Sequence, residues 1–389
     1  MSQIITFSPA ASVFGFGALE KLPNELKSRH FKRVLIITDP QIASVGILQK
    51  VLDLMEGSFD VEVFDDAPTE PHSSDVDRQK ERFGSDFDAI LGLGGGSSMD
   101  FAKALTIVMT HGGALGNYVG EVHLPGPVIP VVCVPTTSGT GSQNTQTTVF
   151  TIEGIKLGAS SEYIRPVVSI VDPELTMGLP PSVTRDSGYD ALMHACESFL
   201  ALPSSEVADR PILYQGSNPF SQALSLEAFR YIWSSYRTAI SDGSNREARM
   251  GMSIGSHLAG LAFSHSGLGL VHVLASSLGG MIDAPHGMCL AACTRIGLNY
   301  NLKACEEKFA ILAGHMGNDV GARVAPKTFI DRMLGLIRDL DLPSRPSELG
   351  LKSEETERLL KNALVQTRRI KTNPRPLDDE LFSYIQEGI

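Results

Sequence analysis

The chain has 389 residues, of which 42% are hydrophobic and 20% are charged, and its formal net charge at pH 7 is −11. This composition is typical of a globular protein of about two domains and excludes an intrinsically disordered chain. The acidic balance argues against a nucleic-acid partner, because neutralising phosphates requires clustered Lys and Arg side chains.

The cysteines and the N-terminal sequence give information about the cellular location of the protein. The five cysteines include no CxxC pair, which does not fit a disulfide scaffold or a structural zinc site. The N-terminus lacks the basic start and apolar core of a signal peptide, so we expect a cytoplasmic location. Met250–Ile282 carries no Asp, Glu, Lys or Arg and could span a bilayer by length. Its histidines and repeated glycines favour buried helices instead, and we expect no membrane association.

The first half of the chain alternates short apolar runs with amphipathic segments. Continuous apolar strands separated by helices predict a doubly wound parallel sheet, an α/β fold whose ligands bind at the carboxyl ends of the strands. Two of the expected helices are Ile42–Leu54 and Met99–Met109. The expected strands are Val34–Thr38, Val61–Phe64, Ala89–Leu93, Val128–Val134 and Val167–Val171.

From about Pro180 the strand signals stop and helical periodicity takes over. The expected helices there are Thr184–Leu200, Pro219–Ser241, Arg246–Phe263, Leu268–Met281 and Cys289–Leu302. We therefore divide the chain into an α/β domain over residues 1–180 and an all-helical domain over residues 181–389.

Glycine is concentrated where the strand Ala89–Leu93 ends, in the run Gly94-Gly95-Gly96-Ser97-Ser98. Consecutive glycines let a backbone approach a pyrophosphate closely, and the N-terminus of the following helix supplies oriented N–H groups. A tight turn alone needs fewer glycines, so the run favours phosphate binding.

A second loop, Pro135–Ser142, concentrates hydroxyls and glycines after another strand. By itself it could be a solvated turn. Paired with the first loop, it predicts one nucleotide lying across both loops, which makes the first domain a dinucleotide-binding domain. Asp39, at the end of the first strand, could bind an adenosine ribose and repel a 2′-phosphate, or simply open a turn before Pro40.

Asp190 and His194 are four residues apart within a helical pattern, so both side chains lie on one face and can grip one ion. His272 lies in an apolar helix, and His286 precedes a glycine at the start of another. One carboxylate and three imidazoles suit Fe(II) or Zn(II) with an open position for a substrate oxygen. His257 and His265 share this region and are competing ligands that spacing alone does not exclude.

Four long motifs carry a family resemblance: GGGSSMDFAKA, PTTSGTGS, DPELTMGLPPSVTRDSGYDALMHACES and AGLAFSHSGLGLVHVLASSLGGMIDAPHGM. Together they resemble the iron-containing (group III) alcohol dehydrogenases over nearly the whole chain. The resemblance implies a Rossmann-like dinucleotide-binding domain followed by a helical metal-binding domain, with the metal between them.

The resemblance also assigns residues. Matched by position, the metal ligands are Asp190, His194, His272 and His286, and the same match places Asp39 where preference for NAD is decided. The remaining residues implied for cofactor binding are Gly95, Gly96, Ser97, Thr136, Thr137, Thr140, Ser142 and Lys156.

Several positions depart from the family pattern. Ser276 stands where many members have a second histidine, one turn after the position of His272. Glu70 and His265 stand where some members have Asn, and the loop Leu202–Asn218 is long. These departures cluster where the substrate would be selected. The candidate substrate residues are Phe150, Phe263, His265, Ser276, Arg210 and Arg295, together with that loop.

Arg210 and Arg295 have two interpretations. They either form salt bridges on the surface or bind the anionic tail of a short aldehyde. The several N–H donors of a guanidinium group are suited to such an anion. The resemblance implies reversible hydride transfer between NAD(H) and a small alcohol or aldehyde, in a homo-oligomer such as a dimer. The alternatives are a polyol dehydrogenase or another member of the same superfamily, and a catalytically silent nucleotide-binding protein.

Overall fold

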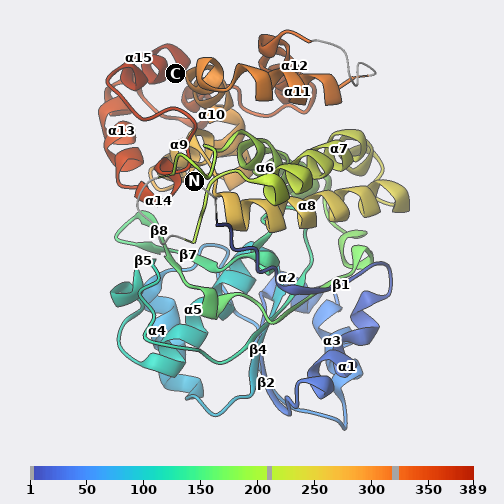
Figure 1. Cartoon of the computed structure of the whole chain (residues 1–389). Coiled ribbons are helices and arrows are strands. Elements are labelled where there is room, and N and C mark those ends of the chain that lie inside the picture. The colour runs from blue at the N-terminus through green and yellow to red at the C-terminus, as the bar shows by residue number, and fades with distance from the viewer. Residues whose placement is uncertain (1–3, 208–212, 318–323) are drawn as a thin grey trace.

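The computed structural model describes residues 4–207, 213–317 and 324–389. Strands and helices alternate in its first half, and the second half is helical (Figure 1). The last strand, β9, ends at Val171, and the first long helix of the second half, α6, begins at Pro181.

A six-stranded parallel sheet forms the centre of the first half, in the order β1-β9-β6-β4-β2-β3. Its two faces build separate cores: Leu35 and Ile37 of β2 pack on one side, and Val34 and Ile36 on the other. This burial on both faces explains why the expected strands read as continuous apolar runs. The strands are β1 (Ala11–Phe14), β2 (Arg33–Ile37), β3 (Asp60–Phe64), β4 (Ala89–Gly94), β6 (Val131–Pro135) and β9 (Val168–Val171).

Helices cover both faces of this sheet. Residues of α1 and α3 share a core with Val34 and Ile36, and residues of α4 and α5 share the opposite core. The expected helix Ile42–Leu54 is two helices, because Gly46 adopts a φ of 81° between them. The helices are α1 (Leu22–Ser28), α2 (Pro40–Ser44), α3 (Ile47–Met55), α4 (Ser73–Phe83) and α5 (Gly96–His111).

A small second sheet was not expected from the sequence. It pairs β5 (Gly120–Glu121), β8 (Ile155–Ser160) and β7 (Thr147–Ile152), with β7 and β8 antiparallel. The hairpin turns at Glu153 and Gly154, both with positive φ, as a tight two-residue hairpin requires.

The helical half is built around α6, in which every residue from Gly188 to Leu200 is buried. The neighbouring helices supply the other side chains of one large core. The helices are α6 (Pro181–Leu200), α7 (Pro219–Ser241), α8 (Arg246–Ser266), α9 (Leu270–Gly279), α10 (His286–Asn301), α11 (Glu306–His315), α12 (Pro326–Asp339), α13 (Thr356–Leu364), α14 (Thr367–Ile370) and α15 (Glu380–Gly388).

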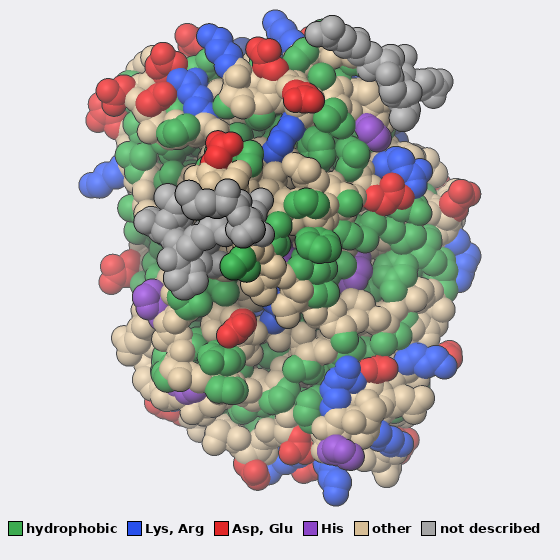
Figure 2. All heavy atoms as spheres, in the orientation of Figure 1, with side chains coloured by type: hydrophobic (Ala, Val, Ile, Leu, Met, Phe, Trp, Pro, Cys, Tyr) green, Lys and Arg blue, Asp and Glu red, His purple; other side chains and the backbone are tan. Residues whose placement is uncertain are grey.

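The long apolar segment noted in the sequence forms α8 and α9. Among the described residues, no single helix has the length and apolar character to cross a membrane; α8 and α9 pass that test only as a pair, bent by 100°. On the face shown in Figure 2, Lys and Arg side chains lie interspersed with Asp and Glu.

Candidate active site

The glycine-rich loop connects β4 to α5, and its glycines are required by close contacts. Gly94 has a φ of 144°, and a Cβ atom on it would lie 2.6 Å from Ser98 Oγ. A Cβ on Gly96 would lie 2.6 Å from Thr140 Cγ2. The free N–H groups of the first turn of α5 follow immediately, so this loop fits an anion such as pyrophosphate.

The second loop follows β6, the parallel neighbour of β4. The two loops touch, since Thr136 N donates to Gly94 O at 3.0 Å and a Cβ on Gly95 would lie 3.9 Å from Thr137 Cγ2. Thr140 and Ser142 line the same cavity as Gly96 and Ser97, and Gly95, Thr136 and Thr137 lie outside its lining.

A buried lysine that the sequence analysis did not identify holds the second loop. Lys103 of α5 donates to Ser142 O at 2.6 Å and Ser142 Oγ at 2.9 Å. It also donates to Thr145 Oγ1 and Thr147 O, each at 3.0 Å. An amphipathic helix was expected here, but nothing in its periodicity shows that this lysine points inward.

Asp39 fills one of the two roles that the sequence left open, since it opens the turn before Pro40, and its role at a ribose stays a prediction. Its Oδ1 accepts from the backbone N–H groups of Gln41 and Ile42, each at 3.0 Å, so it caps α2. Its Oδ2 accepts from Ser98 Oγ at 3.0 Å, beside the glycine loop, and it lines a second cavity of about 480 Å³. Lys156 forms an ion pair with Glu70, and both residues line the first cavity.

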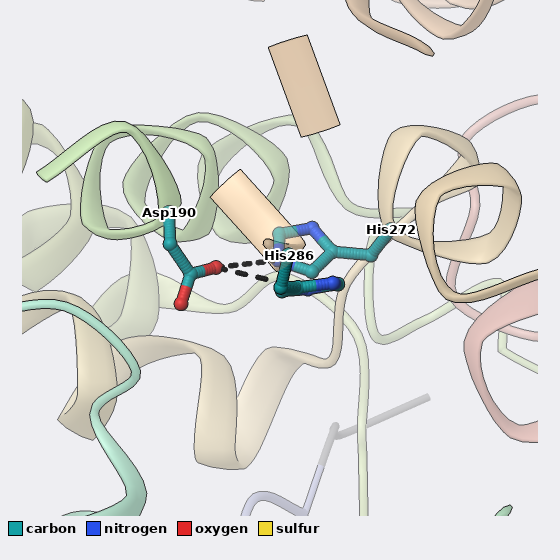
Figure 3. Close-up of side chains that lie close together, drawn as sticks. All are labelled: Asp190, His272 and His286. Carbon is teal, nitrogen blue, oxygen red and sulfur yellow. Dashed lines mark ion pairs between the residues drawn. The ribbon is translucent and has the colours of Figure 1, made fainter. Parts of the chain in front are cut away.

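The carboxylate–histidine cluster gathers one side chain from each of three helices. Asp190 Oδ1 on α6 lies 3.4 Å from His272 Nε2 on α9 and 4.0 Å from His286 Nε2 at the start of α10. One ligand atom from each of these residues lies within 4.8 Å of the other two. In Figure 3 the carboxylate of Asp190 points toward both rings.

His194, the fourth expected ligand, lies at the edge of this group. Its Nε2 is 3.4 Å from the same Asp190 oxygen, and its ring stacks on His272 at 4.6 Å between centroids. Its other neighbour is the ring of Phe263, at 4.2 Å. The structure thus brings all four expected residues together, with His194 outside the three-residue group of ligand atoms.

The donor set fits a divalent metal ion. Asp190 Oδ1 and His272 Nε2 are buried and have no hydrogen-bond partner. Buried polar atoms normally have partners, and an ion placed among these atoms would satisfy both. Such a set of one carboxylate and imidazoles suits Fe(II) or Zn(II).

The protonation states of Asp190, His194 and His286 agree with metal binding. Burial lowers the pKa of His194 to about 4 and that of His286 to about 3, which keeps both rings neutral, the form that ligates a metal. Burial alone would raise the pKa of Asp190, but the surrounding histidines outweigh burial and hold that pKa well below its usual range.

Glu197, also on α6, positions His272. Its carboxylate accepts from His272 Nδ1 at 2.5 Å and from the backbone N–H groups of Val271 and His272 at 2.7 and 3.2 Å. The hydrogen bond at Nδ1 leaves Nε2 free to face Asp190. This residue was not predicted from the sequence, although an acidic residue three positions after His194 in a buried helix was a usable signal.

One cavity of about 210 Å³ connects the cluster to both loops. Of the candidate substrate residues, Phe150, Phe263 and Ser276 line it, and the long loop contributes Tyr214. Arg210 lies outside the described residues.

Two candidate substrate residues lie outside the lining of this cavity. His265 accepts from Ser8 N at 3.1 Å, and its ring lies 4.4 Å from that of Phe7 in a tilted arrangement, so it holds the N-terminal segment instead. Arg295, on α10, is also not a lining residue, and its Nε is buried without a hydrogen-bond partner.

The cavity lining also includes a pair of arginines that was not anticipated from the sequence. Arg368 and Arg369, adjacent on α14, both line the cavity, and Arg369 Nη1 donates to Ser276 Oγ at 2.8 Å. His257, a competing ligand candidate, is instead bonded to Asn144 Nδ2 at 3.0 Å.

Known proteins resemble this chain along its full length. It is 34% identical over 376 residues to the NAD-dependent methanol dehydrogenase of Bacillus methanolicus, covering 95% of each chain. It is 33% identical over 389 residues to the sulfoacetaldehyde reductase of Bilophila wadsworthia, covering 96% of each. The crystal structure of a 1,3-propanediol oxidoreductase matches with a TM-score of 0.90 at 31% identity, covering 100% of both chains.

Two family profiles match consecutive parts of the sequence. The profile described as iron-containing alcohol dehydrogenase matches residues 9–173. The profile described as the C-terminal part of the Fe-containing alcohol dehydrogenase family matches residues 184–385. With the sheet, the loops and the carboxylate–histidine cluster in place, these matches show that the chain belongs to the iron-containing alcohol dehydrogenase family.

Proposed function

We propose that this protein is a metal-dependent oxidoreductase that transfers a hydride reversibly between NAD(H) and a small alcohol or aldehyde. The observation that carries the proposal is the shared cavity, which is lined both by Gly96, Ser97, Thr140 and Ser142, here called its cofactor end, and by the four candidate ligands, here called its metal end. A dinucleotide lying across the loops would present its reactive carbon toward the cluster.

Each end of the cavity has its own role. The glycine loop and the N-terminus of α5 bind the pyrophosphate, and the hydroxyls of the second loop orient the cofactor. Asp190, His194, His272 and His286 would hold the ion, which would supply Lewis-acid polarisation of the substrate oxygen. Iron is the metal that the family name indicates, and Zn(II) suits the same donors.

Within this mechanism the chain's own residues position and enclose the reactants. Glu197 fixes the ring of His272, and Phe263 covers the ring of His194. Ser276 already accepts a hydrogen bond from Arg369. Because a serine hydroxyl is not a base at neutral pH, we assign the proton transfer to water or to ribose hydroxyls.

The names of the relatives indicate which classes of substrate to consider. They include a neutral alcohol, methanol, and a sulfonated aldehyde, so family membership leaves the charge of the substrate open. The partner is a small molecule, and polyol oxidation is the nearest alternative. The unpaired buried atoms of Asp190 and His272 argue against a catalytically silent protein, because burying them without an ion costs free energy. A dimeric assembly and a cytoplasmic location stay predictions from the sequence.

A metal-reconstitution assay tests the proposal. Enzyme loaded with Fe(II) or Zn(II) should oxidise NADH with small aldehydes; a chelator should abolish this activity, and the metal should restore it. The reverse reaction with NAD and a panel of monohydric alcohols and glycerol-type polyols separates the two substrate classes. Failure of metal-loaded enzyme to oxidise NADH with every aldehyde would contradict the proposal. Preference for NADPH over NADH would contradict the role given to Asp39.

A further inference from the structure

The cavity lining includes two adjacent arginines that hydride transfer to a neutral aldehyde does not require. Arg368 and Arg369 are consecutive on α14, and both line the cavity that contains the carboxylate–histidine cluster. Placing two like charges side by side in a partly buried site is unfavourable unless something compensates them.

The two guanidinium groups are held by neutral partners. Arg369 Nη1 donates to Ser276 Oγ at 2.8 Å and Gln366 Oε1 at 3.2 Å. Arg368 Nη1 donates to Ser160 Oγ at 2.6 Å and Thr147 Oγ1 at 3.4 Å, and this guanidinium lies 5.3 Å from the ring centre of Tyr214. Within the part of the chain that the structure describes, neither arginine forms an ion pair, and each leaves Nε and Nη2 without a protein partner.

The acidic residues of the cavity already have partners of their own. Glu70 forms an ion pair with Lys156. Asp100 accepts from Ser142 Oγ at 2.6 Å and Val149 N at 3.1 Å. Asp190 faces the histidines of the cluster. Among the described residues, no carboxylate of this cavity therefore lies within ion-pair distance of either arginine. Burial, together with the neighbouring charge of Arg368, lowers the pKa of Arg369 to about 10.

The anchoring of Arg369 places it next to the reacting centre. Ser276 lies on α9 four residues after His272, so its hydroxyl is one helical turn along the same face from a candidate metal ligand. A group held by Arg369 is therefore a short distance from a carbonyl at the cluster. The pyrophosphate loop, Gly94–Ser97, belongs to a different wall, on β4 and α5.

We propose that Arg368 and Arg369 bind an anionic group on a short aldehyde whose carbonyl lies at the carboxylate–histidine cluster. This inference rests on the proposed function and names its substrate class: an aldehyde carrying a carboxylate, sulfonate or phosphonate, or the corresponding alcohol. The acid group is unchanged in the reaction. A hydride from NADH adds to the carbonyl carbon, a proton from solvent adds to the oxygen, and NAD⁺ and the alcohol are released.

Specificity kinetics provide the first test. A neutral aldehyde is compared with aldehydes of matched length that carry a carboxylate, a sulfonate or a phosphonate. We expect kcat/KM to be higher for an acidic aldehyde by about 100-fold, the value of two or so charge-assisted hydrogen bonds. The three acidic aldehydes distinguish planar from tetrahedral anions. Equal efficiency for neutral and acidic aldehydes would overturn the inference while leaving the proposed function intact.

Variants assign the preference to the arginines. Arg369→Gln and Arg368→Gln should each reduce the acidic-to-neutral ratio by about tenfold or more, chiefly through KM. Arg369→Lys should keep part of the ratio, because it retains the charge but not the fork. Arg358→Gln, an exposed position on α13 outside the cavity, is the matched control and should leave the ratio unchanged. A ratio that survives both Gln variants, or variants that raise only the KM for NADH, would overturn the inference.

A binding measurement separates this inference from the proposed function. Ethanesulfonate, which cannot react, is titrated calorimetrically into metal-loaded enzyme with NADH bound. Its Kd should rise at least about tenfold in Arg369→Gln and stay unchanged in Arg358→Gln. Thermal unfolding checks that each variant is folded, and Arg368→Gln and Arg369→Lys replace Arg369→Gln if that variant does not fold. Arginine-dependent binding without turnover of any aldehyde would refute the proposed function and support the anion site. Absence of binding would refute the anion site.

Discussion

The two ends of the cavity are built in different ways. The cofactor end consists mainly of backbone, in the contiguous loops Gly94–Ser98 and Pro135–Ser142, and its shape depends on glycines that leave no room for a Cβ. The metal end consists of side chains that α6, α9 and α10 bring together from distant positions. Substitutions should therefore damage the cofactor end through steric contact and the metal end through lost ligands and lost charge.

The largest effect is expected when the metal end loses two ligands. The double variant His272→Ala plus His286→Ala should lose its metal and reduce kcat/KM at least about a thousandfold, because Lewis-acid polarisation contributes several kcal/mol to the barrier. Metal content by mass spectrometry and NADH oxidation measure both effects. The matched control, His123→Ala plus His315→Ala, removes two histidines outside the cluster and should retain one ion per chain. An ion retained by the first variant would show that the ligands are wrongly assigned.

A smaller effect is expected when the metal ligands are kept and the residue that orients one of them is changed. Glu197→Gln loses the carboxylate that accepts three N–H groups around His272, and we expect metal affinity to fall about 10–100-fold. Competition with a chromogenic chelator gives the affinity, and Glu387→Gln, on the exposed part of α15, serves as the control. Unchanged affinity would mean that packing alone orients His272.

The contact between α8 and the segment that follows the second loop should make the stability of the protein sensitive to acid. Burial lowers the pKa of His257 to about 4, and Nδ1 of this ring faces the amide Nδ2 of Asn144, which follows the second loop. Because the folded pKa lies below the unfolded value of about 6.5, the unfolded chain binds more protons between these values, and stability is lost as the pH falls from 6.5 toward 4.

The size of this loss can be measured against a variant. From pH 7 to pH 5, the wild type should lose about 2 kcal/mol more unfolding free energy than His257→Gln, which cannot titrate. Denaturant titration at the two pH values, with the same metal loading, gives the difference. Equal losses would place the acid sensitivity in other buried histidines.

The smallest effect is expected at the cofactor end. In Gly96→Ala the new methyl group would meet Thr140 Cγ2, and overpacking of this kind costs on the order of 1–3 kcal/mol, which weakens NADH binding about tenfold or more. The metal content should not change. Adding Thr140→Ser removes Cγ2 and should restore part of the affinity. Gly126→Ala, where a Cβ has no atom within 4 Å, is the control for a fluorescence titration with NADH. Loss of metal in Gly96→Ala would contradict the separation of the two ends.

The same contrast explains which parts of the molecule the sequence predicts. Strands β2 and β4 are recognisable in the sequence because both faces of the central sheet are buried, so Val34–Ile37 and all positions of β4 lack polar side chains. The edge strand β1 has largely exposed positions, and β7 is rich in threonine, so neither presents a continuous apolar run. The glycine loop is recognisable because its residues are consecutive.

Sites that depend on long-range packing are harder to predict. The four candidate ligands stood out as polar residues in apolar helices, and the family resemblance reinforced them. Arg368 and Arg369 lie in a charged stretch that looks like an ordinary surface. Only the packing of α14 beside α9 gives them a place in the cavity. The sequence suggested that an arginine binds an anionic tail and offered Arg210 or Arg295. It could not show that Arg368 and Arg369 are the arginines that line the cavity.

The buried amine of Lys103 connects the two loops through α5. This helix begins inside the glycine loop at Gly96. Two turns later its lysine donates to Ser142, at the end of the second loop, and to Thr145 and Thr147, which follow that loop. Because α5 is a continuous helix, we expect a displacement of either loop to move the other loop as well. The two loops are therefore expected to respond together, as one unit, to a ligand bound at either of them.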